Sequence, residues 1–302
     1  MRFLAALIVS LLLVSSRADA TTSPVRIVVL GIAQDGGVPH AGCVKLCCTT
    51  GARQLVSSLA VVDEAAKRWW LFDATPDIAL QMQRMRAEAP ACTLAGVLLT
   101  HAHIGHYTGL MHLGREVMGA KGVRVHAMPR MRDYLASNGP WSQLVSLGNI
   151  ALQPLTADST IALSERVHVT AFRVPHRDEL SETVGFRIEG PSKSAVFLPD
   201  IDKWERWNRP IEDLVRTSDV AYLDGTFFDG SELPGRDLRE IPHPTMLESL
   251  ARFHTFTQDL RQRVRFIHLN HTNPALQERS VARRRIEAEG LRVAREGERF
   301  GL

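Results

Sequence analysis

The chain has 302 residues, of which 45% are hydrophobic and 23% are charged, an ordinary composition for a globular protein. That length suits one large domain or two small ones and allows a sizeable core. The formal net charge of +3 is too small for a protein that binds a phosphate backbone, so a nucleic-acid partner is not expected.

The N-terminus has the pattern of a secretory signal peptide. A basic start at Arg2 is followed by residues 3–14, which are apolar except for Ser10 and too short to span a bilayer comfortably. Ala18-Asp19-Ala20 then forms a small-x-small cleavage site. We expect residues 1–20 to be removed and the mature chain to be periplasmic or secreted. The alternative is an uncleaved membrane anchor, which would be the chain's only contact with a membrane.

Hydrophobic periodicity, with Gly and Pro as boundaries, predicts alternating strands and helices along the rest of the chain. Strands are predicted over residues 25–30, 57–62, 69–72, 94–99, 123–127, 167–174, 184–188, 195–198, 220–223 and 265–268. Helices are predicted over residues 76–88, 107–118, 131–136, 245–256 and 275–287. Two strand-rich halves with outer helices indicate an α+β (α/β) sandwich of two sheets covered by helices.

Three histidines follow the apolar strand at residues 94–99. His101 and His103 alternate with Ala102, so in an extended loop their side chains point the same way. His106 stands where the next helix begins and can turn its ring toward the same point. Three imidazoles that converge at a strand end are a natural metal site. The alternative, a polar loop with incidental histidines, does not explain this spacing.

This segment resembles the His-x-His-x-Asp-His signature of the metallo-β-lactamase superfamily, with Gly105 at the aspartate position. The resemblance implies a single domain over residues 21–302 with the αββα fold and with metals at one edge of the sheets. Without a side chain, position 105 cannot provide a ligand to the second metal. We expect that metal to bind weakly, or to use Asp178, Glu179 or water, and we expect Gly105→Asp to strengthen it.

Four more strand ends resemble the family's site. Asp73 resembles the aspartate that orders the histidine loop, although it could instead cap the helix that follows. His176 resembles a ligand of the first metal, and Asp200 the carboxylate shared by two metals. His268 resembles the last ligand of the second metal, with His271 as the competing candidate. Taken singly, these residues could be a solvated loop histidine or a turn aspartate.

The resemblance therefore implies two metal sites and a hydrolytic reaction. The first site would use His101, His103 and His176, and the second would use His106, His268 and the shared Asp200. Nitrogen and oxygen ligands suit zinc, with manganese and iron as alternatives. A metal with an open position produces hydroxide near neutral pH, which would attack an ester, phosphodiester or amide-type bond of a small molecule. Asp200 and His176 would act at the catalytic centre.

Longer strings resemble the branch of pyrroloquinoline quinone (PQQ) biosynthesis protein B, which is close to the cyclic phosphodiesterase of phosphonate breakdown. These strings lie at residues 31–39, 174–179 with 182–186, 198–204, 223–227 and 268–274. An enzyme of quinone-cofactor formation, with iron as a candidate metal for oxidation, is therefore the alternative to an exported hydrolase. A non-catalytic binding protein with a degenerate metal site is the third reading. The sequence does not indicate the substrate or the oligomeric state.

A cysteine cluster follows the Gly36-Gly37 turn. Cys43, Cys47 and Cys48 lie close together, and relatives carry a structural zinc site here that a histidine completes. By this resemblance His243 would be the fourth ligand. The alternative is a disulfide, because an exported protein meets an oxidising compartment.

Overall fold

The computed structural model describes residues 24–302. The predicted signal peptide, residues 1–20, and its cleavage site lie outside this range. Within the described residues, no helix has both the length and the apolar character that crossing a membrane requires.

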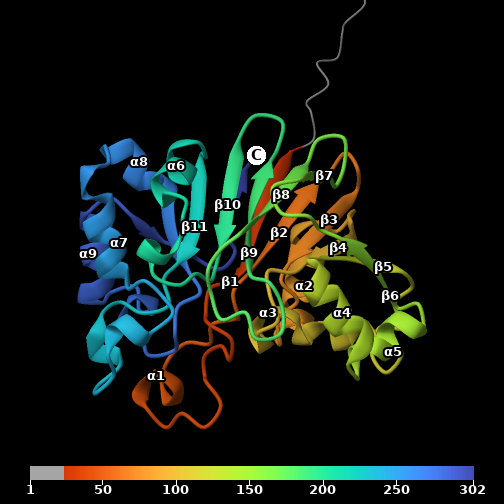
Figure 1. Ribbon diagram of the computed structural model, residues 1–302, viewed down its shortest axis with the longest axis horizontal. Helices are drawn as coiled ribbons and strands as arrows, with labels where there is room; N and C mark the ends of the chain where they lie inside the picture. Colours follow the sequence, from red (N-terminus) through yellow and green to blue (C-terminus); the bar gives the residue numbers. More distant parts are fainter. Residues whose placement is uncertain (1–23) are drawn as a thin grey trace, which may run out of the picture.

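Two seven-stranded sheets face each other (Figure 1). The first has the order β14-β1-β2-β3-β4-β5-β6 and the second the order β13-β12-β11-β10-β9-β8-β7. The strands of the first sheet are β1 (Val25–Gly31), β2 (Ser58–Asp63), β3 (Arg68–Phe72), β4 (Thr93–Leu98), β5 (Val123–Ala127), β6 (Ile150–Pro154) and β14 (Arg299–Gly301). Those of the second are β7 (Thr160–Ala162), β8 (His168–Arg173), β9 (Val184–Glu189), β10 (Ser194–Leu198), β11 (Val220–Asp224), β12 (Val264–Ile267) and β13 (Arg292–Val293).

Helices cover the outer face of each sheet (Figure 1). The helices beside the first sheet are α2 (Ile78–Glu88), α4 (Pro129–Ser137) and α5 (Trp141–Ser146). Those beside the second are α6 (Ile211–Arg216), α7 (Met246–Arg252), α8 (Gln258–Arg263) and α9 (Val281–Ala288). Two short helices, α1 (Leu46–Thr49) and α3 (Ile104–Tyr107), lie in loops near the lower end of the view.

Three apolar layers hold this sandwich together. Ile27 and Val29 of β1 face the central core between the sheets, whereas Val28 and Leu30 face the helices of the first half. This alternation follows from the period of two in a strand. Because both faces of the strand are buried, its sequence is apolar except for the half-buried Arg26. A third core joins the second sheet to its own helices. The predicted αββα sandwich in one domain is confirmed.

The site is built where parallel strands end. β3 pairs in parallel with β4, and β10, β11 and β12 run parallel to one another. Parallel neighbours end at a common sheet edge, so the segments that follow them meet there. The structure corrects three predicted helices in detail, of which the one at 245–256 is α7 followed by a 3₁₀ turn over Phe253–Thr255. The first, at 107–118, is α3 followed by a 3₁₀ turn over Thr108–Leu113, and the last starts as a 3₁₀ turn over Pro274–Leu276 before α9.

Candidate metal centre

The first group of predicted ligands converges as the spacing suggested. His103 has an extended backbone, with φ −97° and ψ 151°, and directly precedes α3. His101 Nε2 lies 2.8 Å from His103 Nδ1. His176, in the loop after β8, brings its ring centroid to 5.3 Å from that of His101 and 5.1 Å from that of His103. One ligand atom from each of the three histidines lies within 4.8 Å of the others.

The second group surrounds Asp200, which follows β10. Asp200 Oδ2 lies 3.1 Å from His106 Nε2 and 3.2 Å from His268 Nε2. Asp200 Oδ1 lies 3.6 Å from His176 Nε2, so the carboxylate stands between the two groups. His271 is elsewhere, stacked on His40 with ring centroids 4.3 Å apart. The geometry therefore brings His268, rather than His271, into the cluster.

The donor set fits metal ions. Among residues 24–302, buried polar atoms of the cluster that have no hydrogen-bond partner include His106 Nε2, both ring nitrogens of His176, Asp200 Oδ2 and His268 Nε2. Leaving buried polar atoms unpaired is costly, and natural proteins keep few of them. Imidazole nitrogens and carboxylate oxygens that converge without hydrogen bonds are the ligands expected of one or two divalent transition metals.

An aspartate and a threonine orient the histidines of the first half. Asp73, after β3, accepts hydrogen bonds from the Thr100 backbone N–H at 2.8 Å and from His106 Nδ1 at 2.7 Å. The Thr100 hydroxyl also lies 3.0 Å from His101 Nδ1. With Nδ1 engaged, His106 presents Nε2 to the centre. Asp73 therefore orders the histidine loop and does not cap α2, whose N-cap is Asp77.

The second half of the chain contains the same arrangement of an aspartate and a threonine that contact two histidines. Asp224, the last residue of β11, accepts hydrogen bonds from the Thr226 hydroxyl at 2.7 Å and from His243 Nδ1 at 2.8 Å. The Thr226 hydroxyl also lies 3.1 Å from His268 Nδ1. One Asp–Thr pair in each half of the sandwich thus holds two histidines, and His106 and His268 both direct Nε2 toward Asp200.

The direction of the histidine pKa shifts differs between the first and second groups of ligands. Burial lowers the pKa of His176 to about 4 and holds the pKa of His101 well below its ordinary value, so both rings are neutral at pH 7. Burial would lower the pKa of His106 as well, but the Asp73 and Asp200 carboxylates outweigh it and raise that pKa well above normal. Burial would raise the pKa of Asp200, but His268 and His106 hold it well below its usual range.

The structure corrects the place predicted for His243. This buried histidine contacts Asp224, and its ring centroid lies 5.3 Å from that of His176. It forms a candidate ligand group with His176 and Asp200, and it is absent from the cysteine group. The reason is local: β11 ends in the buried Asp224, whose carboxylate binds His243 at the centre.

Neither residue suggested as a replacement for position 105 reaches the second group. Asp178 accepts a hydrogen bond from the Thr183 hydroxyl at 2.9 Å and lies 3.8 Å from Arg173. Glu179 Oε2 lies 3.3 Å from His103 Nε2, beside the first group.

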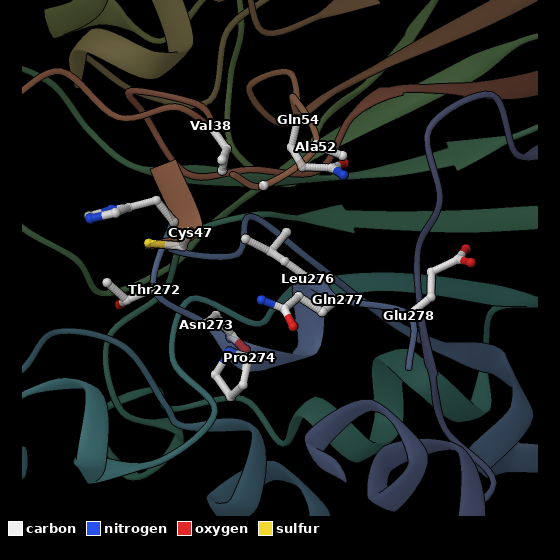
Figure 2. Close-up of a pocket in the computed structure, with 12 residues that line it drawn as sticks. Val38, Cys47, Ala52, Gln54, Thr272, Asn273, Pro274, Leu276, Gln277 and Glu278 are labelled. Atoms are coloured by element: carbon white, nitrogen blue, oxygen red, sulfur yellow. The ribbon is translucent and has the colours of Figure 1, made fainter. Parts of the chain in front are cut away.

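The cysteine loop is a separate structure that contains α1. Cys43, Cys47 and Cys48 bring their sulfurs within 4.8 Å of one another, and all cysteines are free thiols. The His40 backbone N–H donates to Cys48 Sγ at 3.3 Å. Beside this loop is a pocket of about 480 Å³, whose lining includes Cys47 and residues between Thr272 and Glu278 (Figure 2). Its lining includes His271, the candidate ligand that the structure keeps away from the cluster.

Sequence reasoning missed several residues of the centre: Asp35, Thr100, Asp224, Thr226 and the true place of His243. Asp224 carried a usable signal, because it ends an apolar strand as Asp73 does. Asp35 carried no such strand-end signal, since it belongs to a loop far from the histidines in sequence.

Comparison with known proteins identifies the family to which this chain belongs. Residues 68–269 match the model of the beta-lactamase superfamily domain. "Coenzyme PQQ synthesis protein B" of Methylobacterium sp. (strain 4-46) is 30% identical over 89% of this chain and 97% of its own length. The Ruegeria pomeroyi protein of the same name is 29% identical over 90% of this chain and 98% of its own.

Solved structures share the fold. Zn²⁺-bound PqqB from Methylobacterium extorquens superposes with a TM-score of 0.76 at 24% identity, over 92% of this chain and 100% of that one. A diphosphatase of the PhnP family superposes with a TM-score of 0.65 at 20% identity, over 92% and 97%. The chain therefore belongs to the metallo-β-lactamase superfamily, in its PqqB-like branch.

Proposed function

We propose that this chain is a metal-dependent enzyme that acts on a small molecule in the formation of a quinone cofactor, the role for which its relatives are named. The observation that carries this proposal is identity of up to 30% along nearly the full length of both chains. The converging histidines and carboxylates support a catalytic rather than a degenerate centre.

Some residues of the centre would bind the metal ions, and others orient the residues that bind them. His101, His103 and His176 would hold one ion, and His106, His268 and Asp200 the other. Such ions supply Lewis-acid activation of water or of a substrate group. The Asp73–Thr100 and Asp224–Thr226 pairs fix the ring orientations, which second-shell partners of metal ligands commonly do.

His243 is suited to hold a proton beside the substrate. Its Nδ1 is engaged by Asp224, which leaves Nε2 as the nitrogen that can exchange a proton at the centre. Burial would lower the pKa of His243, but the Asp224 and Asp200 carboxylates raise it, so the proton is retained more strongly than on a free histidine.

A second candidate is an exported hydrolase of esters, phosphodiesters or amides. The sequence from Arg2 to Ala20 favours it, because a step in cofactor synthesis belongs in the cytoplasm whereas this leader predicts export. The same ligands and the same proton-holding histidine serve hydrolysis equally well.

Complementation separates the two candidates. A bacterium that lacks its own PQQ synthesis protein B would receive either the full chain or residues 21–302, and PQQ would be measured by mass spectrometry. We expect residues 21–302 to restore PQQ and the same chain with His103→Ala to fail. If PQQ stays absent although the protein is soluble and metal-loaded, the cofactor role is wrong. Turnover of phosphodiesters, lactones or β-lactams by the purified protein would then support the hydrolase.

A further inference from the structure

We propose that Asp35, in the loop after β1, supplies to the second metal the carboxylate that position 105 cannot. This inference rests on the proposed metal-dependent function. It concerns a residue that lies outside the part of the chain matched by the superfamily model, which begins at residue 68.

Asp35 fills the space that a side chain at position 105 would need. A Cβ built on Gly105 would lie 2.3 Å from Asp35 Oδ1 and 2.6 Å from Asp35 Cα. Real Cβ atoms do not approach other atoms so closely, so the two positions exclude each other. A carboxylate that reaches in from another loop therefore stands where the family signature places one on the histidine loop.

The Asp35 carboxylate faces the ligands of the second group. Its Oδ1 lies 3.4 Å from His106 Nε2 and 3.8 Å from His268 Nε2. These are the two nitrogens that also approach Asp200 Oδ2. Asp35, His106 and His268 each offer a ligand atom within 4.8 Å of the others. Two imidazoles and two carboxylates thus surround one point.

Asp35 Oδ1 is itself buried without a hydrogen-bond partner among the residues the structure describes. A carboxylate kept only for an ion pair would be expected to use its oxygens in hydrogen bonds. An oxygen that is buried, unbonded and directed at two unbonded imidazole nitrogens is better explained by a shared cation.

Backbone hydrogen bonds fix the loop beside His268. Gln34 N–H donates to the Leu269 carbonyl at 2.8 Å, and Leu269 N–H donates to the Ile32 carbonyl at 2.8 Å. Ala33 forms isolated bridges with both Val56 and Leu269. The chain next to Asp35 is therefore tied to the chain that carries a ligand of the same metal, which pre-positions the carboxylate.

The test compares the metal content of Asp35→Asn and Asp35→Ala with that of the parent. The matched control is Asp178→Asn, because Asp178 is the nearby carboxylate that instead bonds Thr183. Each protein is loaded with Zn²⁺, dialysed and measured by plasma mass spectrometry, and the affinity of each equivalent is found by competition with a chelator. The thermal unfolding of each apo-protein reports whether the fold survives.

We expect both Asp35 variants to lose one Zn²⁺ equivalent relative to the parent, or to bind it at least ~10-fold more weakly, which is the smaller effect reported for residues around metal ligands. The control should keep the parent's content. Parent-like content and affinity in Asp35→Ala overturn the inference, as does a parent that binds no second ion in the cluster. If the parent fails to restore PQQ while the Asp35 variants still lose Zn²⁺, the result counts against the cofactor role and leaves the metal-ligand inference supported.

Discussion

At the residue scale, Asp35 explains why this chain has glycine at position 105, where the family signature has aspartate. The sequence alone suggests that glycine removes a ligand. The structure shows that the glycine makes room for Asp35, whose Cα would lie 2.6 Å from any added Cβ. The absence of a side chain at position 105 is therefore a requirement of the local packing.

This packing reverses the expectation that Gly105→Asp strengthens the second metal. The new side chain would displace Asp35 and the backbone tied to Leu269. We expect Gly105→Asp and Gly105→Ala to lose affinity for that metal, measured by chelator competition. Gly301→Ala is the control, since a Cβ there meets nothing within 4 Å. Tighter binding of a second ion in Gly105→Asp would show that Asp35 is not needed.

The two groups of histidines should respond differently to pH. Burial lowers the pKa of His176 to about 4 and lowers that of His103, so protons compete little with the first metal near neutrality. The pKa of His106 is raised well above normal because Asp73 and Asp200 outweigh the effect of burial. The second ion must therefore displace a proton from His106, and its affinity should fall as the pH drops from about 8 to about 6.

Calorimetric titration in buffers of different ionisation enthalpy counts the protons released by each ion. We expect more protons to be released by the second equivalent than by the first. Equal release, with the same pH dependence for both equivalents, would contradict the assignment of His106 to the second site.

At the element scale, the sequence predicted the strands that carry the site well and the long-range partners poorly. The apolar run at residues 94–99 lies just before His101, and residues 265–268 end in His268. These two segments correspond to β4 and β12. Short-range spacing was also sufficient for His101, His103 and His106, which share one loop. Edge strands such as β7 and β14 were missed because they are only three residues long, too short to show a period.

Residues that join the centre from other elements could not be found by spacing. Asp35 reaches the site because its loop is hydrogen-bonded to the chain at Leu269, and His243 reaches it through its hydrogen bond to Asp224. His243 was assigned by resemblance to the cysteine loop. The hydrogen bond to Asp224 places it in the histidine cluster instead.

The cysteine loop should therefore bind its metal without His243. We expect Cys43, Cys47 and Cys48 to hold zinc, and His243→Ala to leave that ion in place while it reduces activity at the centre by ~10²–10⁴-fold, the usual contribution of a general acid or base. Zinc content and thiol titration of the denatured protein, with and without reductant, measure the first effect. A disulfide between any two of the three cysteines, or zinc lost from the loop in His243→Ala, would contradict this arrangement.

At the scale of the whole molecule, the fold is a pair of similar halves that pack face to face, with the ligand cluster at one edge of the two sheets. Each half ends a strand in an aspartate, Asp73 or Asp224, and adds a threonine that steadies two histidines. The centre therefore depends on the docking of the halves, which the central apolar core between the sheets maintains. A local peptide with only the histidine loop would carry His101, His103 and His106 but would lack His176, Asp200, His268 and Asp35.

Export is a prediction for the whole chain that rests on the sequence of residues 1–20. We predict cleavage after Ala20, because Ala18 and Ala20 provide the small residues that a signal peptidase reads after the short apolar segment. Intact-mass measurement of protein recovered from the periplasm tests this prediction. A mature protein that still begins at Met1, or a chain that stays in the cytoplasm, would refute it and would strengthen the cofactor role.

The central claim is that two ions bind in the histidine cluster and that Asp35 completes the second site. Anomalous diffraction from crystals of the metal-loaded protein, collected on both sides of the metal's absorption edge, tests it most directly. The account predicts one peak among His101, His103 and His176, and another among His106, His268 and Asp200 with an Asp35 oxygen in its coordination shell. A cluster without anomalous peaks, or a second ion that Asp35 does not contact, would contradict it.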